Sequence, residues 1–500
     1  MRKIVLLAFS FLVVLSAGCS PDRDVSEVAT ATQVDDIPTQ TQAVTPTEKS
    51  IPTTTPIPSI RERIANHGYP KLYNQFQSGT PDDATLKDME RLSLWDFVTI
   101  DAESPEAIEY LAGPEGVLRS ANPNLIITFY FSAGNSEPTN EGIFGRFNEG
   151  LQPNWLLRDV NGKLVNAVEF QNGWAGYYNL AAPGLTEYFI EFIQRELIEP
   201  GLFDGVLYDW GACSEFSWWN DRHMAENDGA RIDLDQDGVG ETDEEFDSLM
   251  REGLRNLHNR SREIFGDEIL LHGNGGGDST PLYVTTLNGN MIEDFQSAIE
   301  PEPQDQYRIS WSSQMMVYGS YALQAQEPRI ASNVVNGEQD PDNFDLMRFT
   351  LASTLLFDGY YAFVGSHPVY GYWATTWWYD EYSVDTQTGQ AVESLEYKGY
   401  LGEPLGPAFN EFDPAQQLID ALGIGAGPVD FSNKVAETKV WRRDFEHGIV
   451  LVNPTNKSMT VDLGDTFRKI QGTRDPVFND GSEVNSIVLP PTSGVILLRW

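Results

Sequence analysis

The sequence predicts an α/β fold: a (β/α)8 TIM barrel followed by a small antiparallel β-sandwich domain. Between residues 60 and 428, short apolar runs rich in β-branched and aromatic residues alternate with helical stretches. This alternation fits a single barrel, which needs about 250 residues plus loop insertions, better than two doubly wound domains. Residues 429–500 differ, because turn residues separate alternating runs at 438–445, 448–453, 458–463, 484–490 and 494–500. These runs predict the antiparallel domain.

Residues 1–18 are expected to be a signal peptide. Arg2 and Lys3 precede an apolar run that is shorter than the roughly 20 residues of a membrane-spanning helix. Small residues then lead to Cys19, in a pattern that resembles the lipobox of bacterial lipoproteins. We therefore expect Cys19 to be lipidated and to hold the protein in a bacterial cell envelope, outside the cytoplasm, on either the cytoplasmic or the outer membrane. An ordinary signal peptide followed by a chance cysteine is the alternative.

Residues 19–59 are expected to form a disordered tether between the membrane and the barrel. They are rich in Thr and Pro and poor in large apolar residues, so they cannot bury enough surface to fold. Cys213 is the only other cysteine, so a lipidated Cys19 leaves no intrachain disulfide. The folded part must then be stabilised by its core alone.

The charge balance limits the partners. The chain has 33 Lys plus Arg against 74 Asp plus Glu, a formal net charge of -41. Such a chain repels nucleic acid and anionic lipid headgroups, so the N-terminal lipid is the only expected membrane contact. The sequence also lacks a Gly-x-Ser-x-Gly elbow, a phosphate-binding loop and a histidine pair at helical metal spacing. The oligomeric state stays open.

Eight barrel strands are expected, at residues 71–76, 97–101, 125–131, 206–209, 269–272, 291–293, 329–335 and 360–364. Two helical stretches flank the fourth strand. Residues 183–199 have apolar side chains at helical spacing, and residues 242–265 begin at a capping box of Thr242 and Glu245 and end at Gly266. This succession of helix, strand, long loop and helix is typical of a parallel barrel.

Two carboxylates stand where a barrel places its chemistry. Asp209 ends the fourth expected strand and Glu293 ends the sixth. Alternate strands of a barrel direct their C-terminal ends toward one cleft. Two acids across a sugar ring are the catalytic groups of a glycosidase, one ionised and the other protonated. The alternative is that either acid caps a helix or faces solvent in a loop.

Aromatic residues gather in the expected loops after strands four and eight, at Trp210, Trp218, Trp219, Trp373, Trp377 and Trp378. Sugar C–H faces stack on such rings, although rings under long loops can equally be packing residues. The residues expected to contact a carbohydrate substrate are Asp101, Tyr130, Trp210, His272, Asn274, Trp377 and Asp380.

A calcium site is expected in the loop after the fourth strand. Its sequence satisfies the pattern Asp-x-Asp-x-Asp-Gly-x5-Glu. Hard cations such as Ca²⁺ take about 6 to 8 oxygen ligands, and this spacing supplies them. The expected ligands are Asp233, Asp235, Asp237, the Val239 carbonyl, Glu241 and Glu244. The role would be structural, and a solvated acidic loop is the alternative.

Several motifs together resemble one family. Residues 204–210, 289–295, 355–361, 378–382 and 400–406 are similar to the hypothetical glycosyl hydrolases of the type numbered fifteen, and residues 445–454 resemble the C-terminal β domain of amylase-like enzymes. The resemblance implies a barrel of the melibiase and amylase type, with a strand-four nucleophile and a strand-six proton donor. Those roles fall on Asp209 and Glu293, in the arrangement of retaining enzymes. No substrate is implied.

We therefore expect a surface-anchored glycoside hydrolase that acts on a polysaccharide or oligosaccharide. An inactive carbohydrate-binding lipoprotein on the same barrel is the second hypothesis. A solute-binding lipoprotein is a third, but it would need two lobes joined by a hinge, which the single long alternation does not favour.

Overall fold

The computed structural model describes residues 57–79, 83–102, 104–136, 142–170, 173–275, 280–295, 310–366, 373–427 and 429–499. These residues belong to one compact unit. Cys19, the signal peptide and nearly all of the tether lie outside the described residues. In the described part of the chain, every helix is too short or too polar to cross a lipid bilayer.

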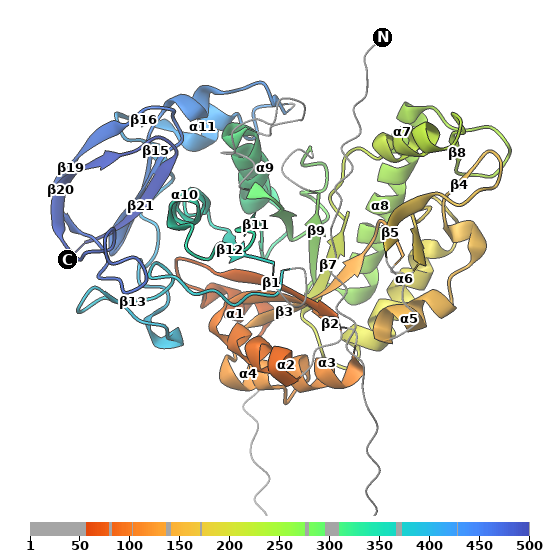
Figure 1. The fold of residues 1–500 in the computed structure, drawn as a ribbon, viewed down its shortest axis with the longest axis horizontal. Coiled ribbons are helices and arrows are strands. Elements are labelled where there is room, and N and C mark those ends of the chain that lie inside the picture. Colours follow the sequence, from red (N-terminus) through yellow and green to blue (C-terminus); the bar gives the residue numbers. More distant parts are fainter. Residues whose placement is uncertain are drawn as a thin grey trace, which may run out of the picture. The chain divides into compact units, whose positions relative to one another are not determined.

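Eight parallel strands form the central sheet, in the order in which they occur along the chain (Figure 1). Parallel bridging between Leu72 and Tyr361, with the Tyr361 N–H donating to the Lys71 carbonyl at 3.0 Å, brings the last strand beside the first. The expected barrel and its eight strands are therefore confirmed. The strands are β1 (Tyr73–Gly79), β2 (Phe97–Ala102), β3 (Ile126–Ser132), β7 (Gly205–Asp209), β9 (Leu270–Asn274), β10 (Gly289–Ile292), β11 (Ser332–Asn336) and β12 (Tyr360–Val364).

Helices connect these strands on the outside of the sheet (Figure 1). The expected helix at 183–199 forms as α6 with a π-helical extension at Gln194–Ile198, and the expected helix at 242–265 forms as α8. The capping box is present, because the Glu245 N–H donates to the Thr242 hydroxyl and the Thr242 N–H donates to the Glu245 carboxylate. The helices are α1 (Ile60–Ala65), α2 (Asp83–Glu90), α3 (Pro105–Ala112), α4 (Val117–Ala121), α5 (Gly142–Glu149), α6 (Leu185–Ile193), α7 (Ser217–Glu226), α8 (Asp243–Phe265), α9 (Trp311–Gln324) and α10 (Phe344–Thr354).

Short ribbons extend the loops after β3 and β7. β4 (Arg158–Asp159) pairs with β8 (Ile232–Asp233), and β5 (Asn166–Phe170) pairs with β6 (Gly173–Gly176). The β4–β8 pairing joins the insertion after β3 to the loop after β7.

The barrel interior shows which side chains face the axis. The rings of Tyr73 on β1, Phe97 on β2 and His272 on β9 contact one another across the barrel, with centroids 4.6 to 5.9 Å apart. Leu207 on β7 and Met291 on β10 belong to the same buried cluster. Alternate residues of a strand share a face, so the polar residues that follow these positions by an even number also face the axis at the C-terminal end. These residues are Asp101, Asp209, Asn274 and Glu293.

The C-terminal part forms one seven-stranded sheet in the order β16-β15-β17-β18-β21-β19-β20, and every paired strand runs antiparallel. Its strands are β15 (Phe409–Asn410), β16 (Asp413–Gln417), β17 (Trp441–Phe445), β18 (Gly448–Asn453), β19 (Met459–Arg468), β20 (Glu483–Leu489) and β21 (Ser493–Leu498). A short helix, α11 (Leu418–Leu422), follows β16, and a two-stranded ribbon of β13 (Val384–Asp385) and β14 (Gln390–Ala391) precedes the sheet. β15 and β16 come from residues before position 428, so the sheet draws on both sides of the expected boundary.

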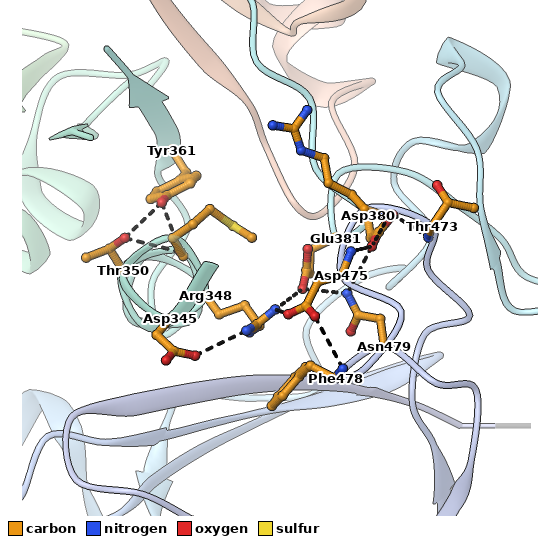
Figure 2. A network of polar contacts seen from close by, with 12 residues as sticks. Asp345, Arg348, Thr350, Tyr361, Asp380, Glu381, Thr473, Asp475, Phe478 and Asn479 are labelled. Carbon is orange, nitrogen blue, oxygen red and sulfur yellow. Dashed lines mark hydrogen bonds and ion pairs between the residues drawn. The ribbon is translucent and has the colours of Figure 1, made fainter. Parts of the chain in front are cut away.

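A buried polar network holds this sheet to the barrel (Figure 2). Both carboxylate oxygens of Asp380 accept backbone N–H groups from the β19–β20 connection, at 3.0 to 3.2 Å. Arg348 of α10 donates to Asp475 at 2.7 Å and its guanidinium lies 3.6 Å from Glu381. Asn479 donates to Glu381 at 2.9 Å. These charges are buried but paired, so the connection is fixed against α10.

Candidate active site

Asp209 is the last residue of β7 and its carboxylate receives three hydrogen bonds. The Tyr130 hydroxyl of β3 donates to Oδ2 at 2.8 Å, and the Asn274 amide of β9 donates to Oδ1 at 2.9 Å. The backbone N–H of Trp210 also donates to Oδ1, at 3.0 Å. Three donors from three segments fix the orientation of this carboxylate and stabilise its charged form.

Glu293 follows β10 directly, and the amide nitrogen of Asn274 donates to its Oε2 at 2.7 Å. One nitrogen atom therefore contacts both acids. Because it lies 2.9 Å from Oδ1 of Asp209 and 2.7 Å from Oε2 of Glu293, these two oxygens are at most about 5.6 Å apart. The structure brings together four residues that the sequence predicted separately, from β3, β7, β9 and β10.

The backbone turns sharply after each acid. Trp210 has φ 63° and Asp294 has φ 55°, which are left-handed conformations that non-glycine residues seldom adopt. Such residues persist only where their surroundings hold them, and they concentrate at functional sites. Here the left-handed residues follow the two acids directly, at the ends of β7 and β10.

The two acids differ in their affinity for protons. Burial raises the pKa of Glu293 to about 8, and the charge of Asp209 adds to this shift while the Asn274 hydrogen bond opposes it. Burial also raises the pKa of Asp209, but the hydrogen bonds from Tyr130, Asn274 and the Trp210 N–H oppose that rise. A pKa of about 8 makes Glu293 the acid of the pair that carries a proton near neutral pH.

Trp210 is half-buried, and its ring packs against Gly134, Trp218 and Trp219. Its indole lies so close to the Gly134 backbone that a Cβ there would come within 2.4 Å of the ring, so position 134 requires glycine. The Trp218 ring stacks on Trp210 with centroids 5.7 Å apart, and 42% of Trp218 is exposed. Trp219 is buried and stacks on Tyr177 at 3.9 Å. Trp218 is thus the most exposed of these three tryptophans, and it stacks on the residue that follows Asp209.

Three other residues expected to contact substrate lie at different depths along the barrel axis. His272 is buried in the barrel interior, below the carboxylates, where burial lowers its pKa to about 3 and its Nε2 lies 3.3 Å from the Ser332 hydroxyl. Asp101 is half-buried at the end of β2. Trp377 packs on Phe363, over the ends of β11 and β12.

Asp380 has a different environment from the one expected. It is 6% exposed and its oxygens accept the backbone N–H groups of Thr473, Arg474 and Asp475 (Figure 2). Its acceptors are therefore occupied by the network between the barrel and the C-terminal sheet. Sequence reasoning had no signal for this contact, because it depends on residues almost 100 positions away.

The expected calcium ligands come together in part. Carboxylate oxygens of Asp233, Asp235 and Asp237 lie within 4.8 Å of one another. Gln236 has φ 61° and Gly238 has φ 91°, so the backbone wraps around this cluster. The β4–β8 pairing and a contact of 3.0 Å between His223 and Asp159 hold the loop against the insertion after β3.

Three further expected ligands do not belong to this carboxylate cluster. The Glu241 carboxylate accepts the Leu234 N–H at 2.9 Å, and Glu244 is exposed in the first turn of α8. Val239 is likewise exposed, with 69% of its surface accessible. Three aspartates therefore form the core of the candidate metal site, and the outer ligands would have to close on a bound ion.

The carboxylate pair has the chemistry of glycosidic bond cleavage. A protonated acid can donate to the leaving oxygen of a glycoside, and an ionised acid within about 5.6 Å can act on the anomeric carbon from the opposite face. Asn274, which the sequence predicts to contact substrate, donates hydrogen bonds to both acids. Its position between the strands of Asp209 and Glu293 was the signal that could have indicated this role.

Comparison with known proteins bears on this assignment. Three solved structures are similar in fold: the glycoside hydrolase domain of PelA from Pseudomonas aeruginosa (13% identity, 60% of this chain and 96% of that chain, TM-score 0.36), an α-galactosidase from Thermus thermophilus (13%, 59% and 58%, 0.35) and an isomalto-dextranase from Arthrobacter globiformis (11%, 88% and 74%, 0.44). None of the curated proteins matches the sequence. Residues 119–449 match the profile described as Hypothetical glycosyl hydrolase family 15, which spans both carboxylates. The chain therefore belongs to Hypothetical glycosyl hydrolase family 15.

Proposed function

We propose that this protein hydrolyses O-glycosidic bonds of an oligosaccharide or polysaccharide with retention of anomeric configuration. Asp209 forms a bond to the anomeric carbon while Glu293 gives its proton to the departing glycosidic oxygen. Glu293 then takes a proton from a water molecule, and that water displaces Asp209 from the sugar. Retaining enzymes work in this way with two carboxyl groups about 5 to 5.5 Å apart.

The observation that carries this proposal is the double contact of Asn274. It limits the gap between the nearest carboxylate oxygens of Asp209 and Glu293 to about 5.6 Å. An inverting enzyme needs room for a water molecule between acid and base, which corresponds to about 6.5 to 9.5 Å. The pKa of about 8 supports the same division of roles, because it makes Glu293 the proton donor.

The test combines activity with stereochemistry. Reducing-sugar release from a glycan panel is expected for the wild type and is expected to fall by about 10³-fold or more in Asp209→Asn and Glu293→Gln. Asp413→Asn, which changes an exposed acid on β16, is the matched control and should keep full activity. Proton NMR of the first-formed anomer should show retention. An inverted product would mean that one of the two roles is misassigned, and binding without release would favour an inactive carbohydrate-binding protein.

We also propose that Cys19 anchors the chain to a membrane of a bacterial envelope, supported by the small residues before it and the Thr- and Pro-rich stretch after it. Cys19→Ala is expected to move the protein from the membrane fraction to the soluble fraction. Retention of this variant in the membrane after salt and carbonate washes would contradict the proposal.

Calcium binding at Asp233, Asp235 and Asp237 is proposed as a structural feature of the active-site rim. It is supported by the close approach of the three carboxylates and by the complete sequence pattern. The ion would hold the loop between β7 and α8, which begins at the catalytic residue Asp209.

A further inference from the structure

Asn274 occupies the strand between the two acids. β9 lies between β7 and β10 in the sheet, and Asn274 ends it. The amide nitrogen carries two hydrogens, and it lies within hydrogen-bonding distance of one acid on each side, 2.9 Å from Asp209 and 2.7 Å from Glu293. One neutral amide nitrogen therefore donates a hydrogen bond to each of the two carboxyl groups.

The orientation of this amide follows from charge. An amide oxygen turned toward two carboxyl oxygens would be repelled, so the nitrogen must face them. The backbone at Asn274 is held as well, because its carbonyl accepts the Ala212 N–H at 3.0 Å and Asn274 pairs with Met291 of β10. The donor is thus fixed relative to the segments that carry both acids.

Asn274 donates hydrogen bonds without adding a positive charge, which affects the protonation of Glu293. Among the described residues, the charges that act on Glu293 are those of Asp209 and Asp294. A lysine at position 274 would add a positive charge that favours the ionised form of both acids, whereas an amide adds none, so the Asp209 charge still favours the protonated form of Glu293. Oε2 of Glu293 accepts from Asn274, and the carbonyl oxygen of a protonated carboxyl group is its better acceptor, so this contact favours a proton on the other oxygen, Oε1.

We infer that Asn274 is a positioning residue, which holds the two carboxyl groups at a fixed separation and directs the Glu293 proton to Oε1. The inference deepens the proposed function and rests on it only for the roles of the two acids. It assigns to Asn274 an action through Asp209 and Glu293, and it requires no contact with the sugar.

The test measures both acids without any substrate. Carboxyl carbon NMR of the full chain, assigned with Asp209→Asn and Glu293→Gln, reports each pKa directly. Asn274→Ala removes a donor that favours the charged form of both acids, so both pKa values should rise, by about 1 unit each. Tyr130→Phe is the matched control, because its hydroxyl contacts Asp209, and it should raise the pKa of Asp209 by a similar amount while leaving Glu293 nearly unchanged.

The outcomes test the positioning role of Asn274 independently of the proposed enzymatic activity. Unchanged pKa values of both acids in an Asn274→Ala variant that folds, as checked by near-UV circular dichroism, would overturn the positioning role. If that variant does not fold, Asn274→Ser decides, because its shorter hydroxyl has one proton to donate and must leave at least one acid shifted; two wild-type values would overturn the inference. Shifted values in a chain that releases no sugar would support the positioning role and reject the enzyme. With an active glycan, the pH limits of kcat should move in Asn274→Ala, whereas a substrate contact would change KM.

Discussion

Trp218 has an accessible aromatic face in the loop after β7. It stacks on Trp210, the residue after Asp209, and 42% of it is exposed. An exposed ring costs free energy in water, and a sugar stacked on it would recover part of that cost. The sequence placed Trp218 in this group but gave no means to tell which tryptophan is open.

For Trp218→Ala we expect KM for an oligosaccharide substrate to rise about twofold to tenfold, from the loss of one stacking contact, with kcat little changed. Phe412→Ala, at an exposed ring between β15 and β16, is the matched control and should leave KM unchanged. A KM that stays at the wild-type value in Trp218→Ala would place the sugar elsewhere.

Two roles can be distinguished for Asp380, a substrate contact and a structural contact. The sequence predicted a substrate contact, whereas the structure surrounds its carboxylate with N–H donors from the C-terminal connection. Asp380→Asn would turn an NH2 group toward those donors and is expected to lower the free energy of unfolding by on the order of 3 kcal/mol. Urea unfolding measures this. An unchanged midpoint together with a raised KM would restore the substrate role.

Among the elements, strands were more predictable than loops. All eight barrel strands and the helix α8 with its capping box could be predicted, because a buried parallel strand is a short apolar run and a helix carries its own cap. The positions of Asp209 and Glu293 at the C-terminal ends of the fourth and sixth strands also follow from the sequence, and in the structure Asn274 contacts both acids. The environment of Asp380 and the packing of Trp210 could not be predicted, since each depends on partners that are distant in sequence.

The loop after β7 is the element in which a metal should be detectable. Millimolar Ca²⁺ is expected to raise the melting temperature, since a ligand at about 100 times its Kd stabilises the folded state by about 2.7 kcal/mol. Chelator should reverse the rise, and Asp235→Asn should abolish it by removing one ligand of the three-aspartate cluster. A melting temperature that is equal in chelator and in Ca²⁺ would leave the loop as a solvated acidic turn.

Across the whole molecule, buried histidines predict how stability responds to acid. Burial lowers the pKa of His67 to about 4 and of His258 and His272 to about 3, from 6.5. Below pH 6.5 the unfolded chain binds protons that the folded chain excludes. The stability that these groups contribute is therefore present above pH 6.5 and is lost as the pH falls toward 3.

We expect calorimetry to show a melting temperature that decreases between pH 6.5 and pH 4. Glu293 acts in the opposite direction, because its folded pKa of about 8 makes stability fall as the pH rises from 4.5 to 8. In Glu293→Gln that opposing slope is absent, so the decrease on acidification should be steeper than in the wild type. An equal slope in the two proteins would mean that Glu293 has the same pKa in the folded and in the unfolded chain.

The C-terminal sheet takes strands from both sides of residue 428, so the segment that matches the family is shorter than the part of the chain that folds as one unit. The segment shared with the family, 119–449, begins inside α4 and ends inside β18. Produced alone, it would lack β1 and β2, leaving β3 and β12 as open edges, and it would lose the β19–β20 connection that pairs with Arg348 and Asp380. Open strands and unpaired buried charges favour aggregation. The smallest soluble form of this enzyme should therefore reach from α1 through β21, well beyond the stretch by which its relatives are recognised.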